Sequence, residues 1–112
     1  MERTVIDLFL NDVRKEIRPA SIFSSFAPAK INDWTCYSIH IDKIIGTLRF
    51  EDTSLTLKLT IPTNASNLMS IHTHQFDYGN PNEFDSNVVA RAINNHITKL
   101  YCPKPQKASN GV

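Results

Sequence analysis

Two histidines lie one residue apart in the segment SIHTHQFDYGNPNEF, residues 70–84, and they are the side chains best spaced for chemistry. On a β-strand, His72 and His74 would point to the same side with their Cβ atoms roughly 6 to 7 Å apart. Two imidazoles at this spacing can hold one zinc ion if a third ligand, such as His40 or Asp77, comes from elsewhere in the fold. The segment therefore predicts, as one hypothesis, a zinc site of His72, His74 and His40 that activates water in a metal-dependent hydrolase.

A solvated strand face is the competing interpretation of the same histidines. Ser70, His72 and His74 would share one side of a strand, with Met69 and Ile71 on the other. A strand side rich in Ser, Thr, Gln and His is typical of a sheet surface in water. We therefore expect the imidazoles to face solvent and expect no resident cofactor, with zinc as the alternative.

Other catalytic patterns are not met. The metallohydrolase pattern H-x-H-x-D-H would need an aspartate at position 76, but the aspartate is Asp77 and the final histidine is missing. The chain has only three glycines, all isolated, so it has no glycine-rich phosphate loop. Cys36 and His40 would share a strand side but lie roughly 13 Å apart, too far for a nucleophile and its base.

Helical spacing of apolar residues predicts the elements that flank the candidate site. A helix is predicted over residues 4–18, ended by Pro19. The segment 19–33 is too long for an ordinary connection, and the spacing of Ile22, Phe23 and Phe26 predicts a short helix there. A last helix is predicted over residues 81–100, with Asn80 as its cap, Pro81 in its first turn and Glu83 in a capping box.

Alternating apolar and polar residues predict four strands, at 34–42, 43–51, 54–61 and 67–76. The third is the clearest, because Leu55, Leu57 and Leu59 alternate strictly with polar residues and require one buried side. The fold class is therefore α+β: an antiparallel four-stranded meander with an N-terminal and a C-terminal helix packed on one face. We expect residues 1–102 to form one α+β domain and residues 103–112 to form a disordered tail.

Composition narrows the range of functions. A chain of 112 residues with a net charge of +1 lacks the basic surplus of most nucleic-acid-binding domains. A basic patch at the end of the first helix, together with Lys99, Lys104 and Lys107, keeps nucleic-acid binding as an alternative. Only two cysteines are present, and no apolar run could cross a bilayer, so we expect a cytoplasmic protein without membrane contact.

Docking on another protein is the leading functional hypothesis. It rests on the lack of a catalytic pattern and on aromatic residues that could anchor an interface. We expect the partner-binding residues to be Phe23, Phe26, Phe76 and Tyr78. An edge strand of the meander could also pair with a second copy, so a homodimer is a further expectation.

Overall fold

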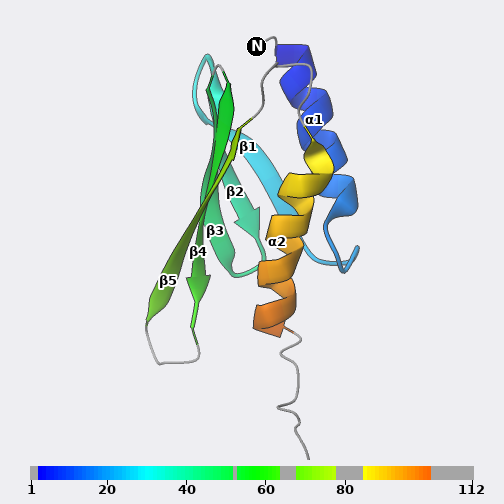
Figure 1. The fold of residues 1–112 in the computed structure, drawn as a ribbon, viewed down its shortest axis with the longest axis vertical. Helices are drawn as coiled ribbons and strands as arrows, with labels where there is room; N and C mark the ends of the chain where they lie inside the picture. Colours follow the sequence, from blue (N-terminus) through cyan, green and yellow to red (C-terminus); the bar gives the residue numbers. More distant parts are fainter. Residues whose placement is uncertain (1–2, 52, 64–67, 78–84, 102–112) are drawn as a thin grey trace, which may run out of the picture.

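The protein folds as a sheet layer covered on one face by a layer of two helices (Figure 1). The computed structural model describes residues 3–51, 53–63, 68–77 and 85–101. The helices are α1 (Arg3–Glu16) and α2 (Ser86–Tyr101). The strands are β1 (Ser24–Lys30), β2 (Asp33–Ile41), β3 (Ile44–Phe50), β4 (Ser54–Pro62) and β5 (Met69–Asp77).

All neighbouring strands are antiparallel, and their order in the sheet is their order in the chain. The predicted α+β class and the antiparallel sheet with helices at both ends of the chain are confirmed. The predicted number of strands is wrong, because the sheet has five strands rather than four.

The additional strand is β1, which replaces the short helix predicted within residues 19–33. Ile22 and Phe26 are four residues apart, a spacing that fits one helical turn and equally two alternations of a strand. Phe26 pairs with Ile39 of β2 and packs against the core. Pro28 would break a helix, but β1 is the edge strand next to β2 in the sheet of the described residues, where a missing N–H is tolerated.

The core lies between the sheet and the helices. The apolar positions of β4 that the alternation predicted as buried are Leu55, Leu57 and Leu59, and each is at most 1% exposed. Ile6 of α1 and Ile93 of α2 are fully buried against this layer. Each such side chain contributes roughly 1.5 to 3 kcal/mol relative to an exposed one, so this layer stabilises the fold and fixes which side of the sheet is covered.

Tight turns set the register of the meander. Asp42, between β2 and β3, has a φ of 51°, and its N–H donates to the Phe23 carbonyl at 3.1 Å. Aspartate tolerates this left-handed conformation, which two-residue hairpin turns require. The predicted hairpin of β3 and β4 is confirmed, and the Glu51 N–H closes it by donating to the Ser54 carbonyl at 2.7 Å.

The helix ends differ from the predicted ones. Residue 85 is not helical, so α2 begins at Ser86 rather than at residue 81, and the Asp85 carboxylate accepts from the Asn87 N–H at 2.9 Å as an N-cap. The predicted cap at Asn80–Glu83 and the tail 103–112 lie outside the described residues. Across the described ranges, neither helix is long and apolar enough to cross a membrane.

Candidate functional site

Strand β5 places His72 and His74 on the covered face of the sheet. His72 is opposite Leu59 and His74 is opposite Leu57, so both imidazoles lie on the same side as the buried leucines of β4. Ile71, 63% exposed, points to the uncovered face instead. We expected the imidazoles to lie on the solvated face of the sheet. This expectation is wrong, because they lie on the face that the helices cover. Alternation shows which residues share a side of a strand, but it does not show which side the helices cover.

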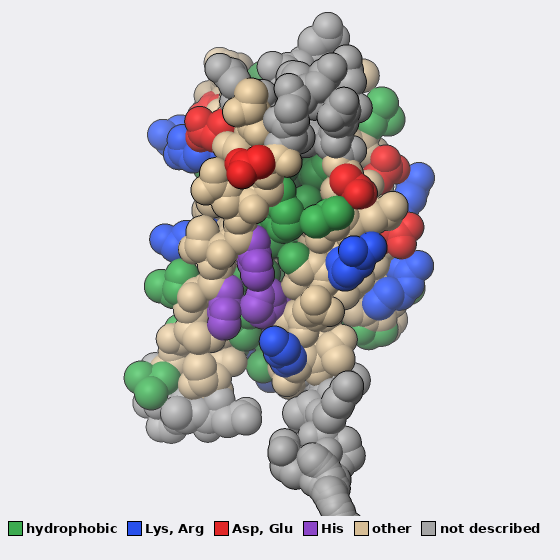
Figure 2. Space-filling view, viewed as in Figure 1, with side chains coloured by type: hydrophobic (Ala, Val, Ile, Leu, Met, Phe, Trp, Pro, Cys, Tyr) green, Lys and Arg blue, Asp and Glu red, His purple; other side chains and the backbone are tan. Residues whose placement is uncertain are grey.

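A third histidine reaches the same place from α2. His96 is 9% exposed, and its ring centroid lies 4.5 Å from that of His72 and 5.1 Å from that of His74. The Nε2 atoms of His74 and His96 are 2.8 Å apart, within hydrogen-bond distance. We call these three residues the histidine cluster. Figure 2 shows histidine side chains gathered in the seam between the sheet and the helix layer.

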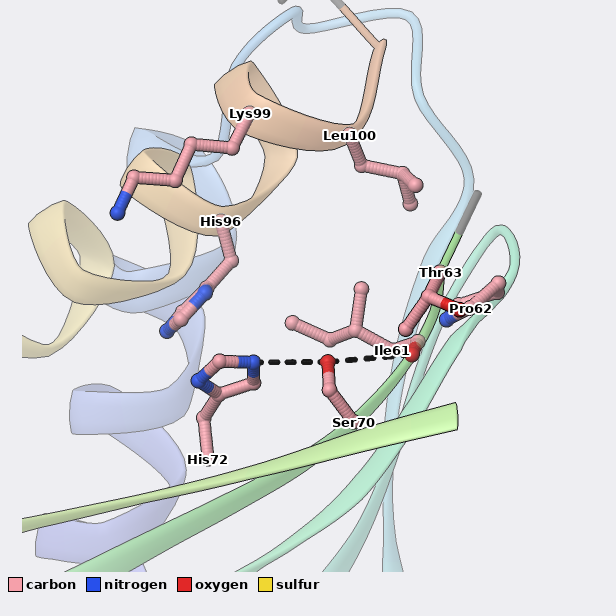
Figure 3. Close-up of a pocket in the computed structure, with 8 residues that line it drawn as sticks. All are labelled: Ile61, Pro62, Thr63, Ser70, His72, His96, Lys99 and Leu100. Carbon is pink, nitrogen blue, oxygen red and sulfur yellow. Dashed lines mark hydrogen bonds between the residues drawn. The ribbon is translucent and has the colours of Figure 1, made fainter. Parts of the chain in front are cut away.

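Ser70 fixes the orientation of the His72 ring. Its Oγ lies 2.9 Å from His72 Nε2 and donates to the Ile61 carbonyl at 3.5 Å. A hydroxyl that donates to a carbonyl can accept from an imidazole N–H. The other ring nitrogen of His72, Nδ1, lies on the side of the ring nearer His96 in Figure 3.

Burial keeps the His96 imidazole neutral. Removal of the ring from water, together with positive charge on His72, His74 and Lys99, lowers its pKa from 6.5 to about 4. At neutral pH the His96 ring therefore carries no charge and can offer a lone pair on Nε2. This is the protonation state that a metal ligand requires.

A hollow of about 340 Å³ opens beside the cluster, at the end of α2 (Figure 3). The residues that line it are Ile61, Pro62, Thr63, Ser70, His72, His96, Lys99 and Leu100. Its wall combines the aliphatic side chains of Ile61, Pro62 and Leu100 with the polar side chains of Thr63, Ser70, His72 and His96. Its volume suits a few water molecules or a small ligand.

His40 is not part of this cluster. It is exposed on the outer, uncovered face of the sheet, on β2, which is separated from β5 by two intervening strands. Its ring meets the ring of Phe23 edge to face, with centroids 5.6 Å apart. The predicted zinc site of His72, His74 and His40 is therefore not brought together. As the side chains are placed, no group of three or more His, Cys, Asp or Glu within the described ranges could hold a metal ion.

The outer face of the sheet carries exposed apolar side chains at one end. Ile45 is opposite Thr60, which is opposite Ile71, and Met69 lies two residues from Ile71 on the same side of β5. Phe23 lies at the β1 end of the same row, against His40. We call Phe23, Ile45, Met69 and Ile71 the outer apolar row; they are between 49% and 63% exposed. Hydrophobic side chains also project at the left edge of Figure 2, on the sheet side.

The four aromatic residues predicted as interface anchors are divided by the structure. Phe23 is exposed in the outer apolar row. Phe26 and Phe76 are half-buried and pack against the core, so their rings are directed away from the outer face. Tyr78 lies outside the described residues. The alternation of KIIGTLRF could have pointed to Ile45, because it places this isoleucine opposite in direction to Ile44 and Leu48.

The basic end of the first helix serves the helix itself. Arg18 Nη1 donates to the carbonyls of Lys15 at 2.6 Å and Ile17 at 3.0 Å, and so satisfies carbonyl groups at the C-terminal end of α1. Lys99 is exposed on α2, and Lys104 and Lys107 lie outside the described residues. Nucleic-acid binding through these residues stays a prediction.

Comparison with known proteins adds no relative. The chain matches no known protein family, and neither a curated protein nor a solved structure is significantly similar to it. The arguments for function therefore rest on the residues and geometry of this chain.

Proposed function

We propose that this protein is a non-enzymatic docking module that binds a protein partner on the outer face of its sheet. The observation that carries the proposal is the outer apolar row, in which four large apolar side chains are exposed at one end of a sheet face that neither α1 nor α2 covers. Scattered exposed apolar residues are ordinary, but several aligned on one open face, here with His40 and Thr60 between them, are characteristic of interaction surfaces.

The neighbouring charge indicates the chemistry of the partner. Lys58 is exposed on β4, opposite Thr47 and Thr73, in the row of outer positions next to the apolar one. A complementary surface would therefore combine apolar side chains with a carboxylate, as an amphipathic acidic helix does. A second copy of this chain docked face to face would bring two Lys58 ammonium groups to one interface, which is unfavourable. We therefore favour a different protein over a homodimer.

Site-specific photo-crosslinking in cells of the source organism tests this proposal. A photoreactive residue at Thr60 lies between Ile45 and Ile71 without replacing either of them, and the same residue at Asn95, exposed on α2, serves as the control position. We expect one discrete adduct from position 60, identified by mass spectrometry, and none of the same mass from position 95. No discrete adduct from position 60, or an adduct with a second copy of this chain, would contradict the proposal.

A pair of matched variants distinguishes binding through the outer face from nonspecific hydrophobic binding. Ile71 on the outer face is 63% exposed and Leu8 on α1 is 61% exposed, so lysine replaces a similar exposed area in each. Ile71→Lys should abolish the adduct, whereas Leu8→Lys should leave it unchanged. Equal loss in both variants, with folding verified by urea denaturation, would show that the outer apolar row is not the docking surface.

A further inference from the structure

The histidine cluster lies on the opposite face of the sheet from the outer apolar row, so docking does not explain it. Three imidazoles from β5 and α2 meet in the seam between the sheet and the helices. Apolar side chains would be more stable at this place, because a buried polar group costs free energy unless it finds a hydrogen-bond partner. A strand contributes two of them at alternate positions, and a helix that packs on that strand contributes the third.

We propose that His72, His74 and His96 form a binding site for a divalent late transition-metal ion, with Zn²⁺ as the preferred ion. As placed, the three rings could not hold an ion, so binding requires that their side chains rotate. Imidazole nitrogen is a favoured ligand of Zn²⁺, and three protein ligands with a fourth open position are typical of sites that keep a water molecule. The proposed donor atoms are Nδ1 of His72, Nε2 of His74 and Nε2 of His96.

The His74–His96 contact is close to the geometry that an ion imposes. Two Zn–N bonds of about 2.05 Å at a tetrahedral angle place their nitrogen atoms about 3.4 Å apart. The two Nε2 atoms lie 2.8 Å apart and share one proton in a hydrogen bond. An ion that replaces this proton therefore has to separate the rings by about half an ångström, which side-chain rotation can supply.

Ser70 provides the support that a metal-bound imidazole requires. A ligating histidine usually donates its second ring N–H to an oxygen, which fixes the tautomer and the ring plane. Here His72 Nε2 lies 2.9 Å from Ser70 Oγ, and that hydroxyl is held in turn by the Ile61 carbonyl. The Nδ1 atom of His72 remains on the side of the ring nearer His96, as Figure 3 shows.

The fourth coordination position would lie toward the hollow beside the cluster. Ser70, His72 and His96 all line this hollow, and the exposed Lys99 lies at its rim. A bound water molecule therefore has room on that side, whereas the leucines of β4 close the other side. The ion would also tie β5, an edge strand, to α2.

Calorimetric titration of the full-length, untagged and chelator-treated protein with ZnCl₂ tests the proposal. We expect saturable binding of one Zn²⁺ per chain. His74→Ala, at a half-buried position of an edge strand, should weaken binding at least about tenfold. His40→Ala, which removes the exposed histidine of the outer face, should leave the affinity unchanged. Absence of saturable binding, or equal affinity in wild type and His74→Ala, would overturn the proposal.

Spectroscopy of the bound ion tests the donor set, including His96, whose replacement could impair folding. Co²⁺ in the same site should give the intense visible absorption of tetrahedral coordination, and His72→Ala should remove it. In ¹H–¹⁵N spectra of the imidazoles, Zn²⁺ should shift His72 Nδ1, His74 Nε2 and His96 Nε2 and leave His40 unchanged. Zn²⁺ shifts confined to His40, or a His72 ring that does not respond, would contradict the site. These results do not depend on whether a partner binds the outer face.

Discussion

Acidification should destabilise the metal-free protein through His96, because unfolding exposes a ring that the fold keeps neutral. Its pKa is about 4 in the fold against 6.5 in the unfolded chain. Between these values the unfolded state binds the extra proton, so the contribution of His96 to stability is complete above pH 6.5 and is lost as the pH falls toward 4. Linkage gives a loss of about 1.8 kcal/mol in the free energy of unfolding between pH 7 and pH 5.

Solvent on the open side of the cluster reduces this figure, and we expect a loss of about 1 to 2 kcal/mol. Positive charge on His72, His74 and Lys99 contributes to the lowered pKa of His96 and is therefore already included in this loss. Urea denaturation at pH 7 and pH 5 with a chelator present measures it. His96→Gln cannot titrate at this position and should show a smaller loss, whereas His40→Gln should behave as wild type. An identical pH dependence in His96→Gln and wild type would refute the reasoning.

Two further substitutions test the contribution of polar groups to stability. Asn94 of α2 accepts from the Arg18 N–H at 2.9 Å and donates to the Glu16 carbonyl at 2.7 Å. Asn94→Ala should therefore lower the free energy of unfolding, measured by urea denaturation, by about 1 to 2 kcal/mol. An unchanged denaturation midpoint would contradict this bridging role. The hydroxyl of Tyr37 is buried without a hydrogen-bond partner among the described residues, so Tyr37→Phe should leave stability unchanged or raise it by up to about 1 kcal/mol. A loss of more than 1 kcal/mol on calorimetric unfolding would reveal a partner for that hydroxyl.

Local patterns predicted most of the elements of this fold. Strict alternation in β4 predicted both the strand and its buried side, because leucine at every second position has only one stable arrangement in a sheet. The prediction of a short helix in the segment that contains β1 was wrong, because the spacing of Ile22 and Phe26 fits a helix and a strand equally well. What distinguishes the two is pairing with β2, a contact between distant segments that local spacing cannot reveal.

Only part of the candidate site could be predicted from the sequence, because the rest depends on contacts between distant segments. His72 and His74 share a side of one strand, which alternation does show. Their meeting with His96 depends on the packing of α2 against the edge of the sheet, and on the choice of the covered face. In the sequence His96 lies among apolar residues of a helix, where it is most simply interpreted as a packing residue, and its contacts confirm that it is buried.

The two-residue period of β5 separates the two proposed activities within one strand. Ile71 points outward into the apolar row, while His72 and His74 point inward to α2. A substitution at an odd-numbered position of this strand therefore changes the docking face and leaves the imidazoles in place, and an even-numbered one does the reverse. A shift of β5 by one residue against β4 would exchange the two sets, burying Ile71 and exposing the histidines. The register of this edge strand is consequently the structural feature on which both proposals depend, and the contact between His74 and His96 helps to hold it.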